Sequence, residues 1–154
     1  MPCFVACLFV LFMSGCSKDP IKDDIVSYSK NAIPAINKFD EEIGKKLDEV
    51  SKENDKNIFL NKIRNEILPM LKGMKDKVEA AKPKTKELQD VHQMYAGMLV
   101  TMEGGMKSLA DSIETNNQTV YRDAIEKINS CQQTENRYKD AFKELAKKHS
   151  VELE

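Results

Sequence analysis

Apolar residues recur at every third or fourth position along most of the chain after residue 20. Between Ile21 and Val50 the steps average about 3.6 residues, the period of an α-helix that buries one face. Asp19 suits the N-cap of a helix and Pro20 suits its first position. The pattern therefore predicts a helix over residues 20–51, which ends in a polar turn.

Three further segments repeat this pattern, over residues 60–81, 85–113 and 120–148. Lys82-Pro83 and Thr115-Asn116-Asn117 separate them. Helices joined by short connections lie antiparallel to their neighbours. The predicted fold is all-α, an up-down-up-down four-helix bundle in a single domain over residues 20–150. A three-helix bundle with one broken helix is the alternative.

Prolines and glycines interrupt this pattern inside the predicted helices. Pro34 and Pro69 each remove a backbone donor and kink a helix. With the first turn centred near residue 52, the two kinks are predicted to lie at nearly the same level of the hairpin. Gly104-Gly105 is predicted to weaken or bend the third helix, and Gly97 to allow a neighbouring helix to come close.

Composition excludes several classes of protein. Hydrophobic residues make up 41% of the chain and charged residues 32%, which fits a folded globular domain and not a disordered chain. The 24 basic residues nearly cancel the 25 acidic ones, so no nucleic-acid partner is predicted. Charge pairs such as Asp23-Asp24 are interpreted as solvated groups on polar faces.

The first sixteen residues form a separate segment. Residues 4–13 are uncharged and apolar, and as a helix they rise about 15 Å, half of a membrane core. That length is typical of a signal peptide. The following Met13-Ser14-Gly15-Cys16 resembles the lipobox of bacterial lipoproteins. The resemblance implies cleavage after residue 15 and a diacylglycerol on Cys16, with or without an N-acyl group. An ordinary cleaved N-terminus is the alternative.

The lipobox resemblance implies a place for the mature protein. Residues 16–19 leave almost no tether, so the domain is expected close to the membrane on its extracytoplasmic side. In a Gram-negative host, Ser17 after Cys16 favours the outer membrane. In up-down-up-down order the second loop shares the lipidated end, and its lysines, Lys82, Lys84 and Lys86, are candidates for contact with anionic headgroups.

The search for catalytic motifs is negative, and one cluster stands out. No P-loop, HExxH or CxxC sequence occurs, so the protein is predicted not to be an enzyme. With the second turn centred at Pro83, one layer of soft ligands suited to Cu(I) is a hypothesis, made of Met70, Met74, His92, Met94 and Met98. Core packing is the favoured interpretation of the methionines, and Cys131 is interpreted as a buried small apolar residue.

The domain also resembles small helical lipoproteins of Gram-positive bacteria whose function is unknown. The likeness lies in Lys82-Pro83-Lys84-Thr85-Lys86-Glu87-Leu88, Val91-His92-Gln93-Met94-Tyr95 and Ala146-Lys147-Lys148-His149. It implies no activity and no cofactor. The function expected is a membrane-anchored, non-enzymatic module that binds an envelope protein or peptide through its helix faces. A lipoprotein that binds a small ligand or Cu(I) is the alternative, and the oligomeric state is left open.

Overall fold

The computed structural model describes residues 19–153, and within them the chain consists of helices and short connections. The all-α class is therefore confirmed. The predicted signal peptide and the candidate lipidation site Cys16 lie outside the described residues. The helical elements follow this order: α1 Pro20–Asn31, α2 Ile33–Ser51, α3 Lys56–Lys62, η1 Ile63–Ile67, α4 Leu68–Ala80, α5 Lys86–Thr115 and α6 Gln118–Lys148. No helix of this part of the chain is both long and apolar enough to cross a membrane.

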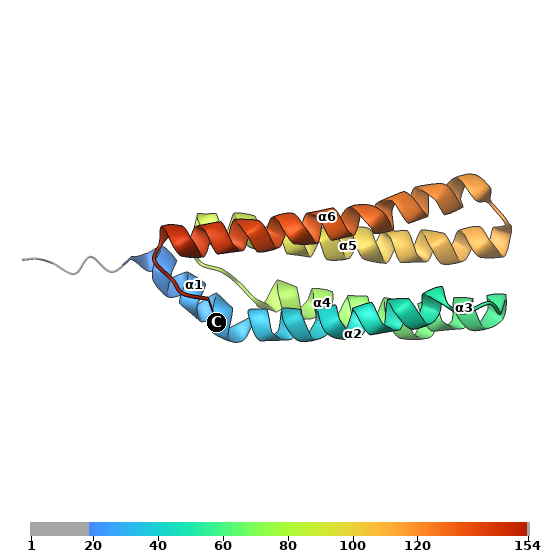
Figure 1. The fold of residues 1–154 in the computed structure, drawn as a ribbon, viewed down its shortest axis with the longest axis horizontal. Helices are drawn as coiled ribbons and strands as arrows, with labels where there is room; N and C mark the ends of the chain where they lie inside the picture. The colour runs from blue at the N-terminus through green and yellow to red at the C-terminus, as the bar shows by residue number, and fades with distance from the viewer. Residues whose placement is uncertain (1–18, 154) are drawn as a thin grey trace, which may run out of the picture.

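The predicted kink at Pro34 is confirmed as the break between α1 and α2. Pro34 has no N–H to donate to the carbonyl of Lys30, so the regular hydrogen-bond ladder is interrupted. Helical hydrogen bonds remain on both sides of the break. The N–H of Ala32 donates to the carbonyl of Tyr28, and the carbonyl of Ala32 accepts from the N–H of Ile36. Asp19 caps α1 as predicted, accepting from the N–H groups of Ile21 and Lys22. Figure 1 shows α1 leaving the line of α2 toward α6.

Pro69 is accommodated in a different way. One π-helical turn, η1, precedes it, and there the N–H of Leu68 reaches back to the carbonyl of Ile63. The wider π-turn accommodates the proline, which has no N–H to donate, and the helical rod continues without a break. The prediction that both prolines lie at one level is wrong. Lys46 forms an ion pair with Glu66 at 2.8 Å, so the level opposite Pro69 lies in the middle of α2, well away from Pro34.

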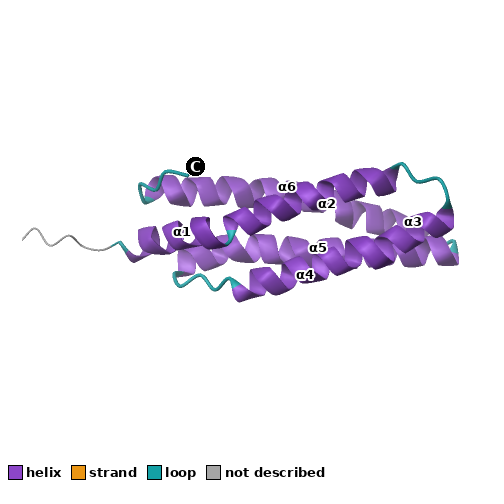
Figure 2. Cartoon of the chain, turned by 90° about the horizontal axis from the view of Figure 1, so that it is seen from below, coloured by secondary structure: helices purple, strands orange, loops and turns teal. Residues whose placement is uncertain are grey.

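The closest packing is between α5 and α6, which run side by side in antiparallel directions (Figures 1 and 2). A Cβ atom on Gly105 would lie 2.9 Å from Ile128 Cγ1, whereas one on Gly97 would meet nothing within 4 Å. The close approach predicted at Gly97 therefore occurs at Gly105. The helix α5 continues without a break through Gly104-Gly105, and the weakening or bend expected there stays a prediction.

The connection between α4 and α5 changes the register of the bundle. Residues 81–85 form no helix. They continue past the end of α4 and lie beside the start of α5 (Figure 2). As a result Lys75 pairs with Glu103, far from the partner that a tight turn at Pro83 would provide. Two ends of the molecule can now be defined. At the Asp19 end, α1 begins, α6 ends and residues 81–85 lie; at the α3 end, α2 turns into α3 and α5 into α6 (Figure 1).

Candidate functional site

An open groove runs between the kinked α1–α2 rod and α6, and we call it the α1–α6 groove. Its volume is about 600 Å³. Its lining is mostly apolar and comes from Val26, Ile33, Pro34, Phe142, Val151 and Leu153. Lys30, Lys139 and Lys143 stand at its edge together with Glu152. Volumes of this size and an apolar lining with a few polar groups are typical of ligand sites.

Two features of the backbone create this groove. The break at Ala32 turns α1 away from the direction of α2, so the rod does not follow α6 along its length. After α6, Ser150 adopts a left-handed conformation (φ 52°), and the N–H of Val151 returns to the carbonyl of Ala146 at 2.9 Å. This turn is typical of helix C-termini. It directs residues 151–153 across from α6 toward α1 (Figure 1).

A layer of buried aromatic residues lies beneath the groove. The hydroxyl of Tyr28 lies 3.0 Å from His92 Nδ1 and 3.5 Å from the hydroxyl of Tyr138. The rings of Tyr95 and Tyr138 pack at 5.1 Å, and Phe142 stacks on Tyr138. Three rods thus contribute polar atoms to one layer, and each hydroxyl can satisfy its neighbour in the low-dielectric core.

Asp40 extends this layer toward α2. The hydroxyl of Tyr95 donates a hydrogen bond to its Oδ1 at 2.7 Å, and Lys139 Nζ lies 3.8 Å from its Oδ2. That Oδ2 atom is buried and accepts no hydrogen bond from the described residues. Burial raises the pKa of Asp40, while the bond from Tyr95 lowers it and the charge of Glu135 raises it. The carboxylate is therefore costly to keep ionised.

The other groups of the layer are held uncharged. Burial lowers the pKa of His92, and a hydrogen bond to the backbone of Val78 opposes that shift. Burial raises the pKa of Tyr28, Tyr95 and Tyr138. Near neutral pH the layer therefore holds a neutral imidazole and protonated phenols, and it functions as a hydrogen-bonded support for the groove.

His92 also lies at the wall of two other cavities. One of about 330 Å³ is lined by Tyr28, Ala32, Met74 and His92, between α1–α2 and α4. Another of about 550 Å³ lies between α4 and α5 and is lined by Val78, Gly97 and Val100 as well as His92. The sequence singled out His92 by its residue type and its expected register opposite Met74, but it did not identify its partners Tyr28 and Val78.

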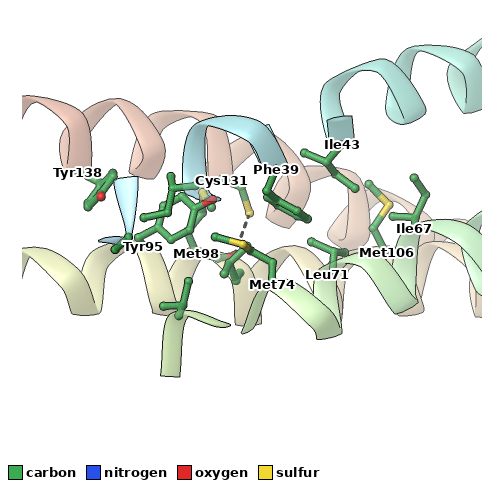
Figure 3. Packing of buried hydrophobic residues seen from close by; sticks show 14 of the residues in the cluster. Phe39, Ile43, Ile67, Leu71, Met74, Tyr95, Met98, Met106, Cys131 and Tyr138 are labelled. Atoms are coloured by element: carbon green, nitrogen blue, oxygen red, sulfur yellow. Dashed lines mark hydrogen bonds between the residues drawn. The ribbon is translucent and has the colours of Figure 1, made fainter. Parts of the chain in front are cut away.

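The five residues of the proposed Met/His layer differ in their burial. Met74, Met98 and His92 are buried, Met70 is half-buried, and Met94 is 40% exposed on the outer side of α5. Met74 and Met98 lie in the core near Cys131, whose thiol donates to the carbonyl of Met98 at 3.7 Å (Figure 3). Cys131 is buried as predicted, and burial raises its pKa. Among residues 19–153 no cluster of three or more His, Cys, Asp or Glu side chains could hold a metal ion.

The lysines of the second loop are exposed at the Asp19 end. Lys82, Lys84 and Lys86 point into solvent, and Lys86 pairs with Asp90 within α5. The segment is fixed by Asp24 of α1, whose Oδ2 accepts three hydrogen bonds of 2.8 Å each, from the N–H groups of Lys84 and Thr85 and from Thr85 Oγ1.

The interpretation of Asp24 as a solvated surface group is wrong, because it is only 7% exposed. One signal in the sequence pointed to this position. Asp24 stands four residues before Tyr28, on the apolar face of the helix. A second contact joins the same end: His149 Nδ1 lies 2.7 Å from Asp19 Oδ2, and this hydrogen bond holds the pKa of Asp19 below its usual value.

Comparison with known proteins gives one match. The model of a family described as EMYY-motif containing lipoprotein matches residues 1–152. No curated protein and no solved structure matches the chain.

Proposed function

The chain belongs to the family of EMYY-motif containing lipoproteins, and we propose that it is a non-enzymatic binding module held at the extracytoplasmic face of a membrane by lipid on Cys16. The family supports a membrane lipid anchor, and Met13-Ser14-Gly15-Cys16 provides the acceptor. The folded domain is proposed to be an up-down-up-down four-helix bundle. Its first rod is α1–α2, its second is α3–η1–α4, and α5 and α6 complete it.

The α1–α6 groove carries this proposal. It offers apolar side chains such as Val26, Ile33 and Phe142 in an opening of about 600 Å³. Removing apolar surface from water favours a complex, and the loss of translational and side-chain freedom on binding offsets part of this gain. The occupant that we propose is an apolar segment of an envelope protein or peptide. Acidic groups beside that segment would meet Lys30 and Lys143 at the edge.

The chemistry of the groove supports binding and not catalysis. Its hydroxyl groups belong to residues such as Tyr138, whose pKa is raised by burial, so a reactive phenolate is disfavoured. Cys131, the thiol of the described domain, is buried away from the groove and its pKa is also raised. A nucleophile needs an adjacent base and access to substrate, and these residues supply neither.

Photocrosslinking in native membranes tests the proposed occupant. A photoreactive phenylalanine at Ile33 or Lys143 is expected to yield one discrete adduct that contains protein. The matched control is the same probe at Val100, which is 57% exposed on the α4–α5 side and is expected to give no such adduct. A Val26→Glu substitution in the groove should remove the adduct from Ile33. Equal yields from Val100, or an adduct with the mass of a lipid, would contradict a peptide partner.

The anchor has a separate test. Mass spectrometry of the native protein is expected to show a chain that starts at Cys16 and carries diacylglycerol. An unmodified Cys16 in the purified native protein would remove the membrane anchor from the proposal. The photocrosslinking experiment does not depend on that result, because the groove is formed by residues after Asp19.

A Cu(I)-binding lipoprotein is the second candidate. The observation that favours it is that Met74 and His92 line the same cavity of about 330 Å³. Thioether and imidazole are suitable ligands for Cu(I). Against it, His92 Nδ1 already lies 3.0 Å from the Tyr28 hydroxyl. Anaerobic Cu(I) titration in competition with a chelator tests this candidate. Met74→Leu is the variant, and Met94→Leu is its matched control. Copper uptake unaffected by Met74→Leu would exclude this site.

A further inference from the structure

One face of the Asp19 end carries positive charge on a rigid frame. Residues 81–85 and the first turn of α5 expose Lys82, Lys84 and Lys86; the acidic neighbours are Glu87 and Asp90, and Asp90 pairs with Lys86. Such a loop is ordinarily mobile, because it has few backbone hydrogen bonds of its own. Here the buried carboxylate of Asp24 accepts three hydrogen bonds from Lys84 and Thr85, which fixes the loop against α1.

The cost of burying Asp24 is offset only by this contact with the loop. A carboxylate placed on the apolar face of a helix loses its hydration, and it is tolerated where several donors replace the water. Asp24 Oδ2 has three such donors, all from Lys84 and Thr85. The side chain of Thr85 donates to Asp24 and makes no N-cap bond to α5. The structure thus uses a buried charge to hold the direction of this loop.

The chain itself indicates which surface this loop faces. The described residues begin at Asp19, three positions after Cys16, and three residues span at most about 10 Å. Residues 81–85 lie at the same end as Asp19 (Figures 1 and 2). Lys147 and Lys148, in the last turn of α6, are exposed at this end as well. A lipid on Cys16 therefore places the end of the molecule that carries these lysines next to the headgroups, where electrostatic attraction acts over about one Debye length.

We infer that the loop Lys82-Pro83-Lys84-Thr85-Lys86, held by Asp24, docks on anionic phospholipid headgroups and sets the orientation of the domain on its membrane. This inference rests on the lipid anchor of the proposed function. Lysines near an anionic membrane surface are attracted to it, and the attraction falls within a Debye length. A rigid loop loses little conformational entropy when it binds, so the contact favours one orientation over free rotation about the anchor.

Hydrogen exchange of the lipidated mature protein, which starts at Cys16, tests the inference on vesicles. We compare vesicles of phosphatidylglycerol mixed with phosphatidylcholine against vesicles of phosphatidylcholine alone. Amide exchange across residues 81–86 is expected to be several-fold slower on the anionic vesicles. Because salt screens the contact, the slowing should disappear at about 0.5 M NaCl. Exchange at the α3 end, across residues 52–57, should be the same on both kinds of vesicle.

Two triple variants separate contact from a general effect of the charged surface. The combined variant Lys82→Gln, Lys84→Gln and Lys86→Gln is expected to lose the slowing. The matched control, Lys52→Gln, Lys56→Gln and Lys107→Gln, removes the same charge from the other half of the molecule and should keep it. Equal exchange on both vesicles, or slowing that persists in the loop variant, would overturn the inference. A failure of the lipid anchor is recognised separately, because the protein would then not remain with the vesicles.

Discussion

The two ends of the molecule are held together by different kinds of interaction. At the Asp19 end, buried or half-buried groups bond across elements: Asp24 to the 81–85 loop, Tyr28 to His92, and His149 to Asp19. At the α3 end, the polar contacts between elements are ion pairs, which range from exposed, as between Arg64 and Glu114, to half-buried, as between Lys46 and Glu66. Buried hydrogen bonds define one geometry, whereas exposed ion pairs contribute little to stability.

This difference follows the secondary structure at each end. The Asp19 end contains a broken helix, an extended connection and the C-terminal turn at Ser150, so few regular helix contacts are available there. Specific polar contacts hold these irregular segments in place. The α3 end consists of helices joined by short turns, with the π-turn η1 directly after α3, and its charged groups keep contact with solvent. Substitutions at the two ends should therefore have unequal effects, as follows from the largest to the smallest.

Asp24→Ala is expected to have the largest effect. The variant leaves the N–H groups of Lys84 and Thr85 without an acceptor and removes the contact that fixes the 81–85 loop. The expected loss in the free energy of unfolding is about 3 kcal/mol, or roughly 10 °C in Tm. Thermal unfolding followed by circular dichroism measures it. Asp23→Ala on the exposed side of α1 is the matched control, and an equal loss in both variants would contradict the special role of Asp24.

Gly105→Ala tests whether the other half of the molecule depends on helix packing. The added Cβ would lie 2.9 Å from Ile128 Cγ1, so α5 and α6 must separate or Ile128 must change its rotamer. We expect a net destabilisation of about 1 kcal/mol, because overpacking exceeds the gain in helix propensity. Gly104→Ala is the control, since nothing lies near its Cβ position. It should raise stability by about 1 kcal/mol in urea denaturation, and a gain in both variants would show that α5 and α6 are not closely packed here.

Acidification should weaken the aromatic layer through His92. Its pKa in the folded chain is lowered by burial, so the unfolded chain binds the proton first. Stability from this residue is therefore complete above the unfolded pKa near 6.5 and is lost as the pH falls below it. His92→Gln should reduce the dependence of Tm on pH between 7.5 and about 5. The effect is expected to be smaller than that of Asp24→Ala.

Asp40 opposes His92 in this measurement. Its raised pKa means that the folded chain retains the proton more readily, so its contribution favours folding at low pH and is lost as the pH rises through that pKa. The comparison of His92 with Gln is therefore made in the Asp40→Asn background, where Tyr95 can still donate to the side-chain oxygen. An unchanged pH profile in that background would indicate that His92 is not held neutral in the folded protein.

Arg64→Ala at the α3 end should have the smallest effect. Arg64 bonds to both carboxylate oxygens of Glu114, at 2.6 Å for one of them, and lies 3.5 Å from Asp111. All three side chains are exposed, so water and salt compete for the contact. We expect a change in Tm near the limit of measurement, which vanishes at about 0.5 M NaCl. A loss as large as that of Asp24→Ala would abolish the contrast between the two ends.

The hydrophobic pattern was sufficient to predict the helices. The period of apolar residues depends only on local geometry, so it located the predicted segments near residues 20–51, 60–81, 85–113 and 120–148. Pro34 correctly indicated the break in the first rod, and Cys131 was correctly interpreted as buried. The lipobox likewise depends on a few consecutive residues.

The register between helices was not accessible from the pattern. Every helix presents an apolar face, but the pairing of levels depends on the path of each connection. The extended segment 81–85 shifts α4 along α5, so Lys75 meets Glu103, and Met94, which was expected in one layer with Met74, is exposed. The turn into α3, at residues 52–55, lies later than the expected centre at residue 52 and, with the π-turn before Pro69, separates the levels of the two prolines.

The sequence by itself determined the helices, their apolar faces and the resemblance of the leader to a lipoprotein signal, because each depends on residues that are neighbours along the chain. Tertiary structure alone decided that Asp24 is buried, that His92 meets Tyr28, and that an apolar groove opens between α1–α2 and α6. Each of these depends on contacts between residues about sixty or more positions apart. Such contacts are determined by the packing of whole helices and by the paths of the segments that join them.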